Sequence, residues 1–163
     1  TGLLHDPRGF PTSRLDEIQP WIERIFRKIE QNASEIVMWE RDGDKDARVV
    51  VIAYGSTARS ARQAIKMVRA RYGRKVGLLR IKTLWPFPEE EVERIGEQAQ
   101  RIIVAEMNLG QVALEVERLV GRRKVLRVGR ADGQMIHPQQ IVDAIRAPRH
   151  HGSRPRPGLK KEA

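Results

Sequence analysis

Cysteine is absent from this 163-residue chain, and its absence excludes several kinds of chemistry. Without a thiol the chain can form no disulfide, no cysteine nucleophile, no cysteine-ligated zinc site and no iron–sulfur cluster. If the protein takes part in electron transfer, the clusters must therefore belong to another domain or subunit. The sequence also offers no Ser/His/Asp or paired-carboxylate arrangement, so we assign no catalytic residue.

Long hydrophobic runs are missing as well. The longest apolar run, 49–54, has the length of a strand, whereas a membrane helix needs about 18 apolar residues. The N-terminus lacks the basic and apolar regions of a secretory signal, so we expect a cytoplasmic protein without a membrane partner. Because the chain starts with Thr1 rather than Met, we expect a cut point within a longer polypeptide.

Basic residues outnumber acidic ones and give a formal net charge of +10. About half of this excess lies in residues 146–163, which are rich in proline, glycine and arginine and have almost no apolar side chain. Such a composition is typical of disorder. We therefore expect a linker arm at 1–13, an α/β domain at 14–147 and a basic disordered tail at 148–163.

An amphipathic helix is predicted directly after the arm. Its apolar residues recur at spacings of three, four or one: Leu15, Ile18, Ile22, Ile25, Phe26 and Ile29. Ser13 is a candidate N-cap, and Pro20 predicts a kink or a late start of the helix. Residues 36–40 are then predicted as a short strand that ends in a turn at Asp42-Gly43.

Four further strands alternate with helices. The strands are predicted at 49–54, 76–81, 102–105 and 125–128, and the helices begin at about Thr57, Glu89, Gln111 and Pro138. Strands and helices at this spacing form right-handed βαβ units. The sequence therefore predicts a three-layer α/β/α domain with a mainly parallel five-stranded sheet, in which the strand at 36–40 is an antiparallel edge.

Gly55, Ser56 and Thr57 lie between a buried strand and a helix start. Free N–H groups at such a position can hold an anion, so one interpretation is an anion nest. The alternative is a tight turn in which Ser56 or Thr57 caps the helix, and capping alone explains these residue types. The segment lacks the further glycines or the lysine of a nucleotide-binding loop.

A second polar segment follows the strand predicted at 102–105. Glu106, Asn108, Gly110 and Gln111 lie at the carboxyl end of that strand, where α/β proteins place functional groups. They are candidates for a functional site or a subunit interface. The alternative is that Asn108 caps the following helix and Gly110 relieves its backbone.

The loop Trp85-Pro86-Phe87-Pro88 is unusually apolar and stiff for a connection after a strand. Proline fixes φ, so docking this loop would lose little backbone entropy, and Trp and Phe would bury a large area. We therefore predict that Trp85, Pro86, Phe87 and Pro88 contact another polypeptide or domain.

Other polar residues have simpler interpretations. Asp42, Asp44 and Asp46 alternate as in a calcium loop, but Gly43 is misplaced and no Glu follows, which favours a solvated turn. His137 precedes Pro138 and is predicted to cap a helix N-terminus rather than to act as a base.

Four segments in order resemble the C-terminal part of the alpha subunit of 2-oxoacid:ferredoxin oxidoreductases, the 2-oxoglutarate type most of all. They are the opening Thr-Gly-Leu-Leu-His-Asp-Pro-Arg-Gly-Phe-Pro-Thr, residues 53–61, the proline loop with its strand at 77–88, and residues 106–111. The resemblance spans residues 1–147 and implies a transketolase C-terminal-like α/β domain.

The resemblance also implies a reaction, the oxidative decarboxylation of a 2-oxoacid with coenzyme A to acyl-CoA, carbon dioxide and reduced ferredoxin. In this family thiamine diphosphate carries the acyl group. The family's Gly-Asp-Gly motif for diphosphate and magnesium is absent, and Asp42-Gly43-Asp44 does not match it. We therefore expect thiamine diphosphate, magnesium and iron–sulfur clusters elsewhere in an oligomeric assembly, and no cofactor or metal on this chain.

In that assembly the chain would supply architecture and contacts, and it would be inactive alone. Its expected partners are the beta subunit, the preceding alpha-subunit domain and, through the assembly, ferredoxin. Two other functions stay open. One is a regulatory module that binds a phosphorylated effector at Gly55–Thr57. The other is a basic nucleic-acid-binding protein, which the lack of a helix-turn-helix, RNA-binding or zinc motif disfavours.

Overall fold

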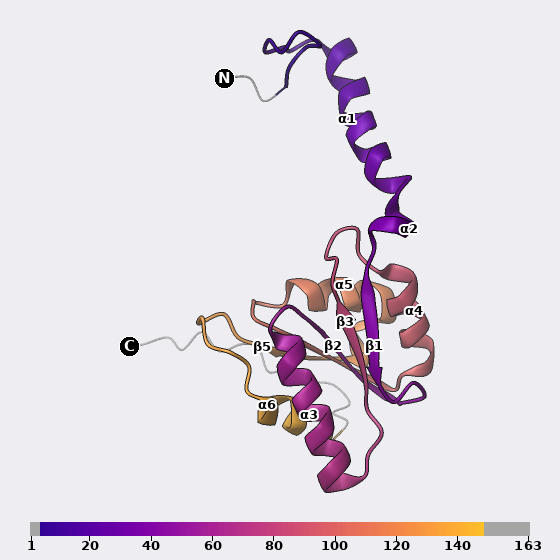
Figure 1. Cartoon of the computed structure of the whole chain (residues 1–163), viewed down its shortest axis with the longest axis vertical. Helices are drawn as coiled ribbons and strands as arrows, with labels where there is room; N and C mark the ends of the chain where they lie inside the picture. The colour runs from indigo at the N-terminus through magenta and orange to yellow at the C-terminus, as the bar shows by residue number, and fades with distance from the viewer. Residues whose placement is uncertain (1–3, 149–163) are drawn as a thin grey trace. The chain divides into compact units, whose positions relative to one another are not determined.

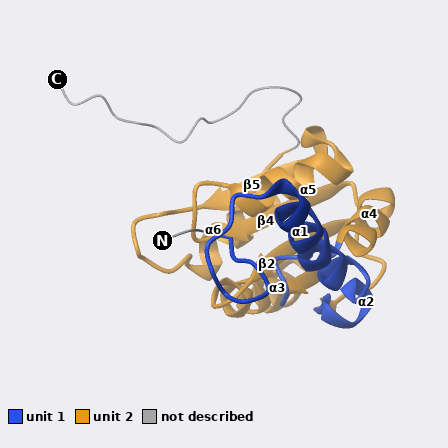
Figure 2. Cartoon of the chain, turned by 90° about the horizontal axis from the view of Figure 1, so that it is seen from above, with its two compact units in different colours: residues 1–39, 82–88 blue, residues 40–81, 89–163 orange. Residues whose placement is uncertain are grey.

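The computed structural model describes residues 4–148, and the chain divides into two compact units, which are coloured separately in Figure 2. The smaller unit comprises residues 1–39 and 82–88, and the larger comprises residues 40–81 and 89–163. The predicted boundaries at 13/14 and 147/148 stay predictions, and the tail from residue 149 lies outside the described residues. Within residues 4–148, no helix is long and apolar enough to cross a membrane.

Figure 1 labels most of the helices and strands. In chain order they are α1 (Leu15–Glu30), α2 (Ala33–Ile36), β1 (Trp39–Gly43), β2 (Val49–Tyr54), α3 (Thr57–Tyr72), β3 (Gly77–Ile81), α4 (Glu89–Gln98), β4 (Arg101–Glu106), α5 (Gln111–Val120), the short 3-10 helix η1 (Arg122–Lys124), β5 (Val125–Gly129) and α6 (Pro138–Arg146).

The five strands form one sheet in the order β1-β3-β2-β4-β5. Strands β3, β2, β4 and β5 are parallel, with Val51 opposite Leu78 on one side and Ile103 on the other. Strand β1 is antiparallel to β3, because Asp44 N–H donates to the Val76 carbonyl at one end while Lys82 N–H donates to the Met38 carbonyl at the other. The predicted mainly parallel sheet with an antiparallel edge is confirmed.

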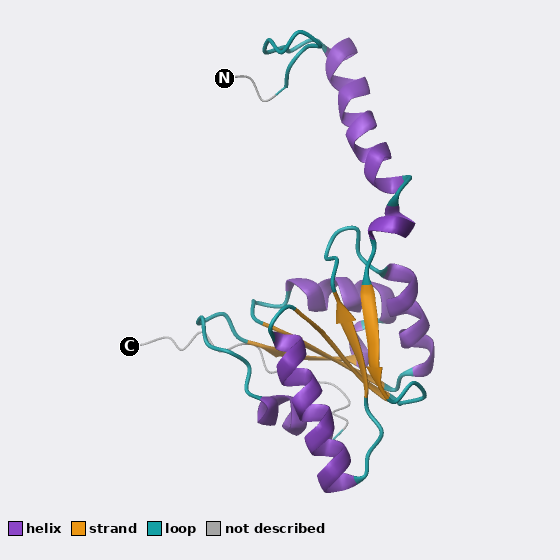
Figure 3. Ribbon diagram, viewed as in Figure 1, coloured by secondary structure: helices purple, strands orange, loops and turns teal. Residues whose placement is uncertain are grey.

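Helices cover both faces of the sheet (Figure 3). Helices α3 and α6 pack against each other on one face, and α4 and α5 on the other. Alternate strand residues face α3 and α6 in one core cluster that includes Val51, Ala53, Ile103 and Ala105. Strand positions between them are buried too, and Ile52 has no exposed surface. The three-layer α/β/α prediction is therefore confirmed.

The strand predicted at 36–40 was placed too early. Residues 33–36 form α2, and β1 covers 39–43. The reason is that β1 is a charged edge strand: Glu40 Oε2 accepts from Arg62 and Arg80, at 3.3 and 3.2 Å. Asp42 likewise accepts from Arg62 at 2.9 Å. Ion pairs rather than apolar side chains mark the strand, so an apolar pattern does not locate it.

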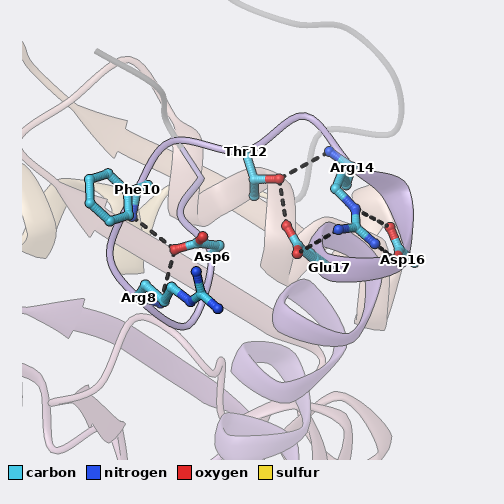
Figure 4. A network of polar contacts seen from close by, with 7 residues as sticks. All are labelled: Asp6, Arg8, Phe10, Thr12, Arg14, Asp16 and Glu17. Atoms are coloured by element: carbon cyan, nitrogen blue, oxygen red, sulfur yellow. Dashed lines mark hydrogen bonds and ion pairs between the residues drawn. The ribbon is translucent and has the colours of Figure 1, made fainter.

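Helix α1 has no side-chain cap at its start. Its N-cap position is Arg14, so the prediction that Ser13 caps it was wrong, and the helix continues through Pro20. Figure 4 shows the polar contacts that organise the preceding segment. Asp6 Oδ1 accepts from the N–H groups of Arg8 and Phe10, and Thr12 donates to Glu17 at 2.6 Å. Arg14 in turn pairs with Asp16 and Glu17.

Within the smaller unit, Thr83 anchors the start of the proline loop. Its hydroxyl donates to the Ile36 carbonyl at 2.9 Å and accepts from Met38 N–H at 3.1 Å. The loop 82–88 is thus fixed to the segment that follows α2, and both belong to the same compact unit.

Helix α4 approaches α5 closely at Gly96. A Cβ at Gly96 would lie 2.5 Å from Val120 Cγ1, well inside van der Waals contact. In an ordinary helix interior, replacing Gly by Ala adds about 1 kcal/mol of stability. We expect the opposite here, a loss of about 1–2 kcal/mol in the free energy of unfolding, because the methyl group forces the helices apart.

Urea unfolding followed by circular dichroism measures this effect for Gly96→Ala. Glu97→Ala, at an exposed position of the same helix, is the matched control and should stay within about 0.5 kcal/mol of the wild type. A Gly96→Ala protein as stable as the wild type would contradict the close packing of α4 and α5.

Candidate functional site

The topology singles out the carboxyl ends of β2 and β4. From β2 the chain passes through α3 to β3 on one side, whereas from β4 it passes through α5 to β5 on the other. The loops after these adjacent strands therefore diverge, and such a switch point is where open α/β sheets bind ligands. The candidates Gly55–Thr57 and 106–111 are the two segments that leave the sheet there.

Glu106 ends β4 and is almost fully buried, with 1% of its surface exposed. Its two carboxyl oxygens accept hydrogen bonds from the N–H groups of Val112 and Ala113, each at 3.0 Å. These N–H groups belong to the first turn of α5, which has no partner for them within the helix. Glu106 thus caps α5 from the end of the preceding strand.

Asn108 holds the loop between β4 and α5. Its Oδ1 accepts from the N–H groups of Gly110 at 2.7 Å and Gln111 at 3.2 Å. Its Nδ2 donates to the Tyr54 hydroxyl at 2.6 Å, which joins the ends of β4 and β2. Asn108 therefore satisfies α5 N–H groups, as the structural alternative expected, although the N-cap position itself is Gly110.

Tyr54 was not identified from the sequence, yet it is the central hydroxyl of the site. Burial, together with the negative charge of Glu106, raises the pKa of the Tyr54 phenol, and the hydrogen bond from Asn108 opposes that shift. The position of Tyr54 as the last residue of an apolar strand was the available signal.

Gly110 is required by both its backbone and its surroundings. Its φ is +109°, and a Cβ there would lie 2.8 Å from a guanidinium nitrogen of Arg127. Arg127 forms a two-point ion pair with Glu117, at 2.7 and 2.6 Å, and this pairing raises its pKa. A side chain at Gly110 would disturb that pair.

The Gly55–Thr57 segment shows a turn rather than a side-chain cap. Ser56 occupies the N-cap position of α3 without a side-chain capping bond, and its hydroxyl donates to Met107 Sδ at 3.7 Å. Gly55 has a φ of +54°, and Thr57 is buried. The anion nest stays a prediction.

The loop Trp85–Pro88 belongs to the smaller unit, whereas the candidates at 55–57 and 106–111 belong to the larger one. Trp85 is 64% exposed, Phe87 is half-buried and Pro88 is buried, and the Trp85–Pro86 peptide is cis. The exposed indole is the part of this loop that another molecule can contact.

Two simpler interpretations have clear outcomes. His137 caps α6 as predicted, since its Nδ1 accepts from Gln139 N–H and its own N–H donates to Gln140 in a capping box. The solvated turn at 42–46 was wrong in part. Asp44 pairs with Arg69 at 2.9 Å and accepts from Val76 N–H, and both contacts lower its pKa.

The carboxyl edge of the sheet thus has polar groups that mostly bind one another. The N–H groups at the start of α5 are occupied by Glu106 and Asn108, so they are not open to a phosphate. Within residues 4–148, no group of three His, Asp or Glu side chains could hold a metal ion. The polar side chains at this edge thus hold the loops after β2 and β4 in place.

We predict that Glu106 contributes strongly to stability. Glu106→Ala leaves two buried N–H groups of α5 without acceptors and should lower the free energy of unfolding by about 2–5 kcal/mol. Glu106→Gln keeps one acceptor oxygen and should lose less.

Urea unfolding measures the series, and Glu115→Ala on the exposed face of α5 is the control, expected within about 0.5 kcal/mol of the wild type. Equal losses for Glu106→Ala and Glu115→Ala would mean that the carboxyl group does not cap α5.

Known proteins with similar sequences belong to one group of oxidoreductases. Residues 47–141 match the model of pyruvate:ferredoxin oxidoreductase core domain II. The chain is 35% identical over 146 residues to the 2-oxoglutarate synthase subunit KorA of Methanocaldococcus jannaschii, which covers 89% of the chain and 39% of that relative. It is 34% identical over 132 residues to the ketoisovalerate oxidoreductase subunit VorB of Methanothermobacter thermautotrophicus, covering 81% of the chain and 36% of that relative.

Solved structures agree. A 2-oxoglutarate:ferredoxin oxidoreductase from Magnetococcus marinus, with 2-oxoglutarate, coenzyme A and succinyl-CoA bound, matches 89% of this chain and 25% of its own, with a TM-score of 0.71 and 26% identity. A split-gene transketolase shares the fold at a TM-score of 0.55. The chain spans less than half the length of these relatives. Because the family model matches more than half of its residues, the chain belongs to the pyruvate:ferredoxin oxidoreductase core domain II family.

Proposed function

We propose that this chain is the core domain II portion of the alpha subunit of a 2-oxoacid:ferredoxin oxidoreductase. The complete enzyme would oxidatively decarboxylate a 2-oxoacid in the presence of coenzyme A and pass the electrons to ferredoxin. The observation that carries this proposal is the similarity to 2-oxoglutarate synthase subunits along 89% of the chain.

2-Oxoglutarate is the first substrate to test. Several relatives are 2-oxoglutarate synthase subunits at 33–36% identity, whereas a pyruvate synthase subunit is 29% identical. Subunits that act on ketoisovalerate reach similar identity over a shorter stretch, so a branched 2-oxoacid is the second substrate to test.

Two features do not fit the cofactors of such an enzyme, the absence of cysteine and the occupied start of α5. Iron–sulfur clusters need thiolates, and the chain has no cysteine. The start of α5, a helix N-terminus at the switch point, already binds Glu106 and Asn108, which leaves no cradle there for a diphosphate. We therefore assign thiamine diphosphate, magnesium and the clusters to other parts of the assembly. A location in the cytoplasm stays a prediction.

We propose that the chain supplies a rigid domain that holds other parts of the enzyme in place. A sheet buried on both faces gives a rigid base, and the Asn108–Tyr54 contact fixes the loops at its carboxyl edge. We propose that these loops and the exposed Trp85 contact the beta subunit and the rest of the alpha subunit.

Reconstitution tests the proposed function. The assembled enzyme that contains this chain should reduce a low-potential dye only when 2-oxoglutarate and coenzyme A are both present, with one succinyl-CoA formed per carbon dioxide. Pyruvate and 2-oxoisovalerate serve as competing substrates. An assembly that retains its thiamine cofactor but oxidises no 2-oxoacid would contradict the proposal. Tight binding of a phosphorylated effector by the chain alone would favour the regulatory alternative.

Trp85→Ala combined with Phe87→Ala should weaken the association of this chain with the rest of the enzyme by at least about tenfold. The reason is that buried aromatic side chains dominate most protein interfaces. Co-purification and titration of the tagged chain measure the loss. Leu114→Ala removes a 54% exposed apolar side chain from helix α5 of the other unit, outside the proposed contact loops, and is the matched control. Unchanged association of the double variant would reject the loop as a docking element.

A further inference from the structure

The amino edge of the sheet, where β3, β2, β4 and β5 begin, is strongly basic. A basic residue stands at the start of each parallel strand or within two residues before it. In the order of the strands in the sheet these residues are Lys75, Arg48, Arg101 and Lys124. Neighbouring strands lie about 4.8 Å apart, so the four positions extend over about 14 Å. All of them belong to the larger unit.

The segments that surround this row add more positive charge. Together with the row they form the amino edge, which comprises residues 44–48, 71–76, 97–101, 121–124 and 146–148. Its acidic residues are only Asp44, Asp46 and Glu97. The further basic residues are Lys45, Arg71, Arg74, Arg122, Arg123 and Arg146. At the opposite edge the loops after β2, β4 and β5 contain a single arginine, Arg130, which pairs with Asp132.

Three of the basic groups have a partner within the larger unit. Arg101 donates to the C-cap carbonyl of α6 at 2.5 Å, and Lys124 donates to the Gly96 carbonyl of α4 at 2.5 Å. Arg146 lies over the ring of Tyr72, 4.5 Å from its centroid. Such contacts are expected at an edge where helices end, because positive charge is favourable beside helix C-termini.

The other basic side chains of the amino edge form no ion pair with any of residues 4–148. Among the acidic groups of the edge, Asp44 pairs instead with Arg69, at 2.9 Å. Like charges gathered in one place repel one another and cost stability. The side chains without an ion pair are Lys45, Arg48, Arg71, Arg74, Lys75, Arg122 and Arg123. A charge excess that the fold does not neutralise indicates an acidic partner.

The chemistry of the edge favours a protein surface over a nucleic acid. Most of the unpaired groups are arginines, whose planar guanidinium pairs with a carboxylate at two points. Proteins that bind single strands stack bases on aromatic rings, and the one aromatic residue of the amino edge, Tyr72, already has Arg146 over its ring. Asp46 and Glu97 would repel a row of phosphates, whereas a protein surface can place basic groups opposite them.

We propose that the amino edge docks an acidic surface of another polypeptide of the enzyme. The inference rests on the proposed function only in that this chain is one part of a larger assembly. It describes a second contact, separate from Trp85 and from the loops at the carboxyl edge. Ion pairs rather than apolar burial hold it, so this contact weakens as the salt concentration rises.

Charge reversal tests the docking surface. Arg74→Glu combined with Arg122→Glu should weaken the association of the tagged chain with the rest of the enzyme by at least about tenfold at low salt. Arg59→Glu combined with Lys66→Glu on α3 changes the net charge equally and is the matched control, with an expected loss below about threefold. Circular dichroism checks that both variants keep their helical content.

Equal losses for the two double variants would reduce the effect to net charge and overturn the proposal. An edge variant that assembles like the wild type would overturn it too. If that variant also loses a binding of RNA that the wild type shows, the edge belongs to a nucleic acid.

A carbodiimide, which joins a lysine amine to a carboxyl group in contact with it, provides the second test. In the assembled enzyme Lys45 or Lys75 should link to an Asp or Glu of another polypeptide, and Lys66 should not. An intact assembly without such a link from either edge lysine would overturn the docking surface. An assembly that oxidises no 2-oxoacid would instead contradict the proposed function, so the two failures are distinguishable.

Discussion

The burial of two adjacent parallel strands on both faces is the constraint from which the larger unit follows. Strands β2 and β4 pair along their length, and residues 51–53 and 102–105 have no exposed surface. Such strands can be shielded only if helices cover both faces, so the connections must leave to opposite sides. The small side chains of α3, Ala58, Ala61 and Ala64, are fully or almost fully buried, which allows that helix to lie close to the sheet.

This constraint creates a switch point of the kind that binds ligands in other α/β proteins, but here side chains of the protein itself occupy the free N–H groups. Where the connections diverge, the start of α5 and the end of β2 lie at one edge of the sheet. Glu106 and Asn108 occupy the free N–H groups of α5, and the second function of Asn108 is to hold Tyr54. A buried carboxyl group satisfied by two backbone donors is a structural tie, since removal of either partner would leave an unpaired buried group. The same geometry that elsewhere holds a cofactor here stiffens two loops.

The sequence predicted the architecture well because the information is local. Each of these signals depends on a few neighbouring residues. The β-branched run 49–54 coincides with strand β2, Gly73 ends α3, and Pro138 begins α6. The bounds of strand β1 were predicted wrongly because this strand is held by ion pairs to Arg62 and Arg80, which are distant in sequence. The roles of Glu106 and Tyr54 depend on how close the ends of β4 and β2 lie to each other and to the start of α5. That distance cannot be read from the sequence. The apolar stripe of α1 is visible in the sequence as periodicity, because its spacing is also local.

Exposed apolar side chains are distributed unevenly between the units. All three tryptophans belong to the smaller unit, where Trp21 and Trp39 are each 37% exposed and Trp85 is 64% exposed. The larger unit instead buries the sheet and helix residues that form its core. Exposed large apolar side chains gathered in one small unit favour the proposal that this unit contacts other parts of the enzyme. Under the proposed function, stability and assembly therefore depend on different segments. Substitutions in the sheet should act on folding, whereas substitutions in residues 15–29 or 84–87 can alter contacts without unfolding the larger unit.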